Sequence, residues 1–314
     1  MNIVVFFSIL AATFHTAFSL TEKGCPDSKA IAPCSCDYDK LTHLFCDHLS
    51  DAETLRTVFK NSEGFLYNEV YVRYSTLKYL PQEMFKNVKV VALHLINITL
   101  AQVFEESPES VEDLKQLDIE NTRALRGVIW EILEPLKNLR ILSIYDNSIK
   151  TLGSEFSQYA SKNLERFSLY FTETETIKPG VFADFPKLNE VAIFNGKLRT
   201  LTRDIFPTPW NGYSLFFSAN QLTEIPKGLF SQMPNLQYLI LSRNQLSVLP
   251  QDAFDGNFGG IKYLTLDNNP LKCDCSMKWI ITDKPEMLRG KCEMPKDKQG
   301  KNLKDLVPED FHCQ

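Results

Sequence analysis

The sequence is short of long hydrophobic runs and of charge blocks, and each absence excludes a class of protein. After residue 19, no stretch of about 18 or more apolar residues is present, so the sequence predicts no membrane-spanning helix. The formal net charge is -5 at pH 7, with both signs scattered along 314 residues, so the basic stripe of a nucleic-acid-binding protein is missing. With 44% hydrophobic and 23% charged residues, the composition is that of a folded protein.

Sequence motifs that carry catalysis are also missing. The chain has no G-x-S-x-G, no H-E-x-x-H and no glycine-rich phosphate loop. Asp118 and Glu120 form an acidic pair of the kind that acid–base chemistry uses. Both occupy outward-facing positions of one predicted strand, so we interpret them as part of a solvated face. We therefore expect no enzyme activity and no cofactor.

Residues 1–19 have the pattern of a secretory signal peptide. A short apolar run covers residues 3–12, and Ala17-Phe18-Ser19 supplies the small-x-small pattern of a cleavage site. The run is too short to span a bilayer comfortably. A buried N-terminal strand and a signal anchor are the alternatives. We expect a secreted, extracellular protein.

Cysteine is absent from the long central region between Cys46 and Cys273. The eight cysteines form two clusters of four, which are Cys25, Cys34, Cys36 and Cys46, and Cys273, Cys275, Cys292 and Cys313. Even-numbered clusters in a chain with a signal peptide predict disulfide bonds, and sequence alone permits three pairings in each. A metal site is the alternative, since His43 and His48 flank Cys46. Zinc usually needs paired ligands at suitable spacing, so we expect no metal.

The region between the cysteine clusters is a repeat with a period of about 24 residues. The clearest unit runs from Leu236 to Phe254, with the pattern L-x-x-L-x-L-x-x-N-x-L-x-x-L-P and then Phe. Nine units begin 23 to 25 residues apart, at Tyr67, Val90, Leu114, Leu139, Leu164, Leu188, Gly212, Leu236 and Ile261. Each L-x-L core predicts a short strand with alternate side chains turned inward. No unit buries its apolar face alone, so the sequence predicts a stacked solenoid with a parallel sheet.

Two further periodic columns accompany this frame. Aromatic residues recur every 24 residues at Phe182, Phe206, Phe230 and Phe254, with Phe85 and Trp279 near the same column, and predict a spine on the convex side. The second column is a ladder position, which holds Asn147, Asn220, Asn244 and Asn269 in four units and Ser75, Ile98, Thr122, Thr172 and Gly196 in the other five. A buried Asn there would bond neighbouring backbone groups. Because Ile98 cannot do so, we expect local irregularity between residues 96 and 136.

The cysteine clusters resemble the caps of extracellular leucine-rich-repeat proteins, a family that includes small proteoglycans, axon-guidance proteins and Toll-type receptor ectodomains. The first is Cys25-x8-Cys34-Ser-Cys36-x9-Cys46, spaced more widely than usual, and the second runs from Asn269-Pro-Leu-Lys-Cys273-Asp-Cys275 to Trp279. Caps cover the exposed ends of a repeat array. The resemblance implies the pairs Cys25–Cys36, Cys34–Cys46, Cys273–Cys292 and Cys275–Cys313.

Together these features predict an α/β-type leucine-rich-repeat solenoid, or horseshoe. We expect a signal peptide at 1–19, an N-terminal cap at 20–66, repeats at 67–272 and a C-terminal cap at 273–314, with a convex side that is mostly irregular or short-helical. The layout, with its early Pro33-Cys34-Ser35-Cys36 motif, is similar to a family of arthropod secreted proteins that includes the non-catalytic, leucine-rich chain of the decapod shrimp luciferase complex. That similarity implies a carrier or stabilising chain and does not imply luminescence.

The outward positions of the predicted strands form an aromatic stripe on the concave face. Its members are Tyr145, Tyr170, Phe194 and Phe216, flanked by Phe171 and Tyr238, with an acidic edge at Asp118 and Glu120. Four adjacent strands span roughly 15 Å. A contiguous apolar patch usually marks a contact site. The alternative is that the rings pack against one another and only cover the sheet.

One glycosylation signal is present, Asn97-Ile98-Thr99, on the concave rim of the second unit. We expect a secreted, non-catalytic protein that binds protein partners, as an accessory chain of an extracellular complex. The alternatives are a matrix or adhesion protein that self-associates and an innate-immune recognition protein. The scaffold does not name its partner.

Overall fold

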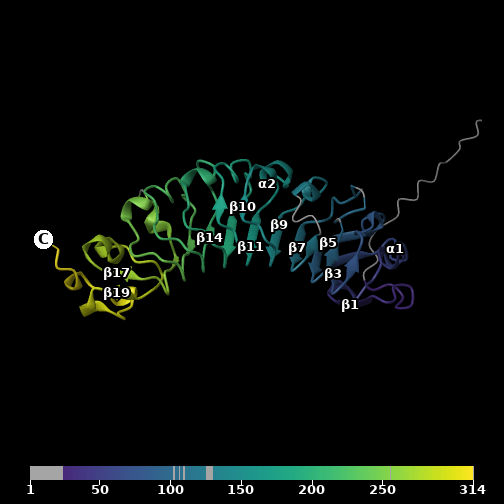
Figure 1. The fold of residues 1–314 in the computed structure, drawn as a ribbon, viewed down its shortest axis with the longest axis horizontal. Coiled ribbons are helices and arrows are strands. Elements are labelled where there is room, and N and C mark those ends of the chain that lie inside the picture. Colours follow the sequence, from purple (N-terminus) through teal and green to yellow (C-terminus); the bar gives the residue numbers. More distant parts are fainter. Residues whose placement is uncertain are drawn as a thin grey trace, which may run out of the picture.

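One strand from each repeat joins a long sheet that lines the concave side of an arch (Figure 1). The computed structural model describes residues 24–101, 103–105, 107–108, 110–124, 130–254 and 256–313, so the predicted signal peptide lies outside the described residues. Within that part, the twelve strands of the sheet are, in spatial order, β1 (Ser35–Asp39), β2 (Leu41–Asp47), β3 (Leu66–Arg73), β5 (Lys89–Ile96), β7 (Gln116–Glu120), β9 (Ile141–Tyr145), β11 (Arg166–Tyr170), β13 (Glu190–Phe194), β14 (Ser214–Phe216), β15 (Tyr238–Ile240), β16 (Tyr263–Thr265) and β18 (Met287–Arg289).

The sheet confirms the predicted leucine-rich-repeat solenoid. Each of the nine predicted units supplies one strand, from β3 to β16, and neighbouring strands pair in parallel. The leucines of the L-x-L core point inward, and Leu239 and Leu241 are fully buried. At the N-terminal end β2 pairs in parallel with β3, while β1 closes the sheet as an antiparallel hairpin with β2.

The convex side is built from short elements, as the sequence predicted. Small parallel sheets join β4 (Thr76–Leu77), β6 (Thr99–Leu100) and β8 (Arg123–Ala124), β10 (Thr151–Leu152) and β12 (Thr176–Ile177), and β17 (Leu271–Lys272) and β19 (Cys292–Met294). The α-helices are α1 (Ala52–Lys60) and α2 (Ser154–Tyr159), and the 3-10 turns are η1 (Gln82–Met84), η2 (Trp130–Leu133), η3 (Arg203–Ile205), η4 (Gln251–Ala253), η5 (Asn257–Gly260), η6 (Cys275–Ile281), η7 (Lys296–Lys298), η8 (Leu303–Asp305) and η9 (Pro308–Asp310).

Helix α1 forms because its sequence supplies both a cap and an apolar face. The Asp51 side chain accepts a hydrogen bond from Thr54 N at 2.7 Å, which satisfies one of the free N–H groups of the first turn. Leu55, Val58 and Phe59 recur at helical spacing and are fully buried. Helix α1 therefore packs its apolar face beneath the first repeats.

The aromatic spine lies behind the sheet. Ring centroids of Phe182 and Phe206 are 5.6 Å apart, and those of Phe230 and Phe254 are 5.0 Å apart. Buried Trp210 lies 5.0 Å from Phe206 and adds an aromatic side chain to the same layer. Bulky rings at this position fill the space between the strands and the return segments.

Ladder asparagines connect successive repeats through backbone groups. Asn244 Nδ2 donates to Phe217 O of the preceding repeat at 2.8 Å, and Asn244 Oδ1 accepts from Leu222 N at 3.0 Å. Asn220 and Asn269 make the same two kinds of bond. Each side chain thus satisfies one donor and one acceptor that the solenoid buries.

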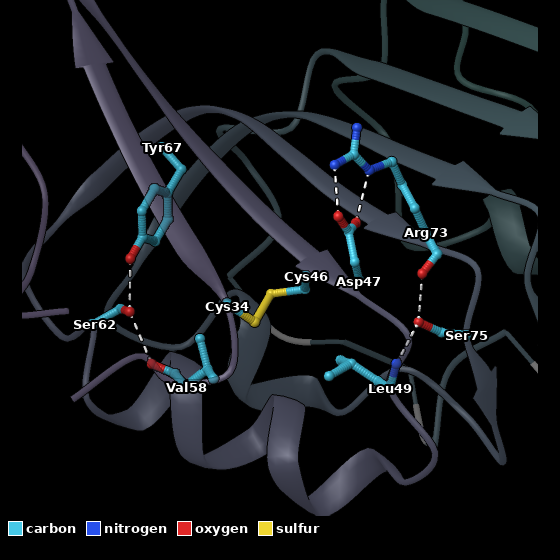
Figure 2. The surroundings of a disulfide bond; sticks show 9 residues. All are labelled: Cys34, Cys46, Asp47, Leu49, Val58, Ser62, Tyr67, Arg73 and Ser75. Atoms are coloured by element: carbon cyan, nitrogen blue, oxygen red, sulfur yellow. Dashed lines mark hydrogen bonds and ion pairs between the residues drawn. A yellow bond between two sulfur atoms is a disulfide. The ribbon is translucent and has the colours of Figure 1, made fainter. Parts of the chain in front are cut away.

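Other residue types at the ladder position use different means. Ser75 Oγ accepts from Leu49 N at 2.9 Å, which reproduces half of the asparagine pattern (Figure 2). Gly196 leaves room for its neighbour, because a Cβ atom on it would lie 2.6 Å from Asn220 Oδ1. Ile98 is buried and apolar. The irregularity expected between residues 96 and 136 does not interrupt the sheet, where β5, β7 and β9 stay in register, and residues 125–129 lie outside the described residues.

Disulfide bonds lie at both ends of the solenoid. The four bonded pairs are Cys25–Cys36, Cys34–Cys46, Cys273–Cys292 and Cys275–Cys313, the pairs that the family resemblance implied. Figure 2 shows Cys34–Cys46 above α1, beside a chain of hydrogen bonds from Tyr67 through Ser62 to Val58 O. The boundaries of the two caps remain predictions.

Candidate functional site: the concave face

The four residues of the predicted aromatic stripe lie on adjacent strands of the concave face, and three of them share one column of the sheet. Tyr145, Tyr170 and Phe194 occupy the same register on β9, β11 and β13 and therefore lie side by side. Phe216 lies in the neighbouring column, because β14 pairs Phe216 with Ala192. Phe216 lies between the two inward residues of its repeat, Leu215 and Phe217. Tyr145, Tyr170 and Phe194 each follow the second inward residue of their own repeat. The stripe therefore turns diagonally across the sheet at β14.

The rings of the stripe stack on one another. Centroid distances are 4.5 Å for Tyr145 and Tyr170, 5.2 Å for Tyr170 and Phe194, and 6.0 Å for Phe194 and Phe216. All four side chains remain half-buried, so the rings cover the sheet and still expose apolar area. Burial raises the pKa of both tyrosines, against a smaller opposing effect of hydrogen bonds to Ser143 and Ser168. Those serines precede the tyrosines by two residues, so the rings lie back along their own strands.

Phe171 and Tyr238 were predicted to flank the stripe, and neither lies in it. Phe171 follows the end of β11 with φ of 57°, and it is 55% exposed on the turn. Tyr238 belongs to a different stack near the C-terminal end, 4.7 Å from Tyr263 and 6.3 Å from Tyr213. Tyr263 and Tyr213 extend the aromatic area of the concave face beyond the predicted residues.

Asp118 is more enclosed than a solvated acidic pair would be. Its side chain is 16% exposed, and Oδ2 lies 2.9 Å from His94 Nδ1 and accepts from Gln116 Nε2 at 2.7 Å. Glu120 lies one column further along β7, in register with Tyr145. Asp118 is therefore the polar centre of the N-terminal half of the face, and Glu120 borders the stripe.

A second aromatic stack, not predicted as part of the site, leads from the N-terminal end to Asp118. Phe45 stacks on Tyr71 at 5.0 Å, and Tyr71 stacks on His94 at 4.4 Å. Burial, together with the hydrogen bond that Tyr71 donates to Glu69, raises the pKa of Tyr71 to about 12. The sequence does contain a signal for this stack: Leu44 and Cys46 alternate with outward residues as in a repeat, although β2 lies in the predicted cap.

Arg73 closes the outer end of this second stack. Its guanidinium donates twice to Asp47, at 2.7 Å each, and lies 5.0 Å from the centre of the Phe45 ring. Figure 2 shows the two parallel bonds of this pair. The concave face itself therefore holds an arginine that is both stacked on an aromatic ring and paired with a carboxylate.

The glycosylation signal lies on the rim of the concave face. Asn97 follows the end of β5 in a left-handed conformation, with φ of 53°, and its side chain is partly exposed. Asn121 Nδ2 donates to Asn97 Oδ1 at 2.5 Å, and Thr99 begins β6. A glycan on Asn97 remains a prediction.

The described part of the chain contains neither a candidate metal cluster nor a candidate membrane span. There, no group of three or more His, Cys, Asp or Glu residues is arranged to hold a metal ion. Among the same residues, no helix combines the length and apolarity needed to cross a membrane.

The fold and the repeat pattern are those of a leucine-rich-repeat solenoid, and the family description "Leucine rich repeat" matches residues 213–271. The chain is 24% identical to the Oplophorus-luciferin 2-monooxygenase non-catalytic subunit of Oplophorus gracilirostris, over 100% of this chain and 96% of that protein. It is 26% identical to lumican of Gallus gallus over 78% of this chain and 62% of lumican. It is 32% identical to podocan of Mus musculus over 40% of this chain and 20% of podocan.

Solved structures share the fold. A chain of the TLR13–ssRNA13 complex superposes with a TM-score of 0.62 at 22% identity, over 77% of this chain and 34% of that one. A chain of the octameric complex of latrophilin 3, Unc5D and FLRT2 superposes with a TM-score of 0.61 at 20% identity, over 90% of this chain and 98% of that one. At these identities the likeness concerns the arched repeat architecture alone.

Proposed function

We propose that this chain is an extracellular, non-catalytic protein that binds another protein through its concave face, as an accessory chain of an extracellular complex. The observation that carries the proposal is the half-exposed stack of Tyr145, Tyr170, Phe194 and Phe216 on a rigid sheet. Similarity along the whole chain to a protein named a non-catalytic subunit supports the accessory role. Disulfide bonds at both ends suit an oxidising, extracellular compartment.

The stacked rings suit binding for an energetic reason. Aromatic side chains supply large apolar areas and are enriched at the centres of protein interfaces. The rings already support one another in the free protein, so little side-chain freedom remains to be lost when a partner binds. Side chains of the stripe lie on strands rather than loops, which keeps their spacing constant.

The test is capture of the native secreted protein with its partner, followed by mass spectrometry. The variant Tyr170→Ala/Phe194→Ala should be secreted normally and should lose the stoichiometric partner recovered with the unmodified protein. A matched control, Tyr38→Ala/Tyr74→Ala, removes two exposed aromatic rings away from the stripe and should retain that partner. Unchanged recovery with the first variant would contradict the proposal.

Self-association in a matrix is the second candidate, and the similarity to lumican and podocan favours it. In that case the purified protein is a dimer held through the concave face. Light scattering would then give twice the mass of the chain, and Tyr170→Ala/Phe194→Ala would return it to a monomer. A monomeric native protein would exclude this candidate.

A further inference from the structure

We infer that the partner places an arginine side chain, from a basic segment of its surface, on the concave face between β7 and β13. The inference rests on the proposed function and specifies the chemistry of the partner. Three independent features support it: the charge of the face, two buried polar atoms without hydrogen-bond partners, and the stacked tyrosines.

Negative charge predominates on the central strands of this face. The outward positions from β3 to β13 include four carboxylates, Glu69, Asp118, Glu120 and Glu190. Arg166, in register with Glu190, is a guanidinium that forms no ion pair with any described residue. Toward the ends, Asp47 and Asp267 are each neutralised by an arginine. Glu120 and Glu190 have no cationic side chain within 4.0 Å among the described residues. A partner of opposite charge is therefore favoured and an acidic one is repelled.

The pair of His94 and Asp118 contains two buried polar atoms without a hydrogen-bond partner among the described residues. His94 is only 9% exposed, and its Nδ1 lies 2.9 Å from Asp118 Oδ2. When a neutral imidazole donates from Nδ1, its Nε2 is an acceptor. Both His94 Nε2 and Asp118 Oδ1 are buried without a hydrogen-bond partner in the described part of the chain. Buried polar atoms normally have partners, and a guanidinium supplies five donors and no acceptor.

The two stacked tyrosines lie on the two strands between those that carry these acids. Strand order places Tyr145 on β9 and Tyr170 on β11, with Asp118 and Glu120 on β7 to one side and Glu190 on β13 to the other. A guanidinium stacks on aromatic faces and pairs with carboxylates in a planar fork, which an ammonium does not do. Arg73 shows this combination within the same face, stacked over Phe45 and paired with Asp47.

The raised pKa of Glu190 is consistent with a carboxylate that faces a cationic partner. Burial raises its pKa, so its charged form is disfavoured in the free protein, and Arg166 offsets this only in part. The charge of Asp118 contributes to the raised pKa of both Tyr145 and Tyr170, after burial. A cation that binds here favours the charged form of Glu190 and is attracted by the negative charge of Asp118.

The test uses a fluorescein-labelled octa-arginine peptide as the probe, and octa-glutamine as its neutral counterpart, with the full secreted chain. Fluorescence anisotropy at fixed ionic strength should show binding of octa-arginine alone. Glu120→Gln and Glu190→Gln should each weaken it about fivefold, and Tyr170→Ala about tenfold. The matched control is Glu155→Gln on α2, an exposed residue that carries the same change of charge away from the sheet. Its affinity should stay within about twofold of the unmodified protein.

Equal weakening by Glu155→Gln and by the concave-face variants would mean attraction by net charge alone and would overturn the inference. Retained binding by Glu120→Gln and Glu190→Gln would also overturn it. Thermal unfolding checks that these variants are folded, and Glu190→Gln should be at least as stable as the unmodified protein because it removes a disfavoured charge.

Failure of this inference and failure of the proposed function give different results. If Tyr170→Ala/Phe194→Ala loses the captured partner while Glu120→Gln/Glu190→Gln keeps it and octa-arginine does not displace it, the face binds a partner of other chemistry. If Tyr170→Ala/Phe194→Ala keeps the partner, the concave face is not the binding surface at all.

Discussion

From β2 to β16, each concave strand is followed within three residues by a residue in a left-handed conformation, where the chain turns away from the sheet. These residues are His48, Tyr74, Asn97, Asn121, Asp146, Phe171, Asn195, Ala219, Arg243 and Asn268, all with φ between 42° and 57°. Asn tolerates this conformation better than most residues, because its short side chain can bond locally. Where the turn holds Phe171, the ring is directed away from the stripe and into solvent. The turn conformation therefore explains why one predicted site residue lies outside the site.

At the scale of single residues, the stability of the solenoid depends on the ladder asparagines. We expect Asn244→Ala to lower the free energy of unfolding by about 2 kcal/mol, because Phe217 O and Leu222 N lose their partners inside the solenoid. Asn147→Ala is the matched control: Asn147 donates to Tyr145 O of its own unit, so its loss should cost less than about 1 kcal/mol. Urea unfolding followed by circular dichroism measures both. Equal losses would show that the asparagine ladder does not connect the repeats.

At the scale of elements, the caps protect the two ends of the sheet. Strand β18 pairs with β16 and covers the last repeat edge, and the segment that contains it is held by Cys273–Cys292 and Cys275–Cys313. At the other end, Arg56 of α1 donates to Glu83 and Glu105, at 2.7 Å each, and so connects the helix to the first repeats. Without such covers, an unpaired strand edge is a site for aggregation.

The cap disulfides should differ in effect according to the loop that each closes. Cys275 and Cys313 are separated by 38 residues, and Cys25 and Cys36 by 11. Replacing both members of the first pair by Ser should cost about 3–4 kcal/mol, and replacing both members of the second somewhat less, because a longer loop gains more entropy when it is released. Thermal unfolding of the two double variants in oxidising buffer gives the comparison. A larger loss from the N-terminal pair would mean that packing around Cys25–Cys36 outweighs loop entropy.

For the whole molecule, the arch divides the concave face into a half bordered by Asn97 and a half that carries the stripe. The turn that holds Asn97 ends β5, and the stripe occupies β9 to β14. A glycan on the rim at β5 would therefore limit access to the Asp118 side and leave the C-terminal part of the stripe open.

Glycan occupancy is directly measurable. The secreted protein should run faster on a gel after endoglycosidase treatment, and Asn97→Gln should remove the shift while leaving secretion intact. Asn121→Gln, one repeat further along, is the control and should keep the shift because it lies outside the glycosylation signal. If the enzyme leaves mobility unchanged, Asn97 carries no glycan.

Much of the fold and part of the site follow from the sequence. The positions of all nine strands and the side chains they bury could be predicted, because each 24-residue unit repeats the same inward pattern. The stacking of Tyr145, Tyr170 and Phe194 also follows, since these residues share one frame position. The stacking of Phe216 on Phe194 and of Tyr238 on Tyr263 could not be predicted, because both contacts depend on which residues pair across the sheet. The Phe45 stack was missed because β2 lies outside the repeat frame.

The sequence by itself determined that this protein is a solenoid, because a repeat that packs only on its neighbours specifies the architecture locally. Tertiary structure decided which outward residues meet. The register of β13 and β14 bends the aromatic stripe, and the addition of β2 to the sheet creates a second stack. It also decided that Asp118 is enclosed beside His94, where one buried atom of each side chain has no hydrogen-bond partner among the described residues. These are contacts between units about 24 residues apart, and a local pattern does not specify them.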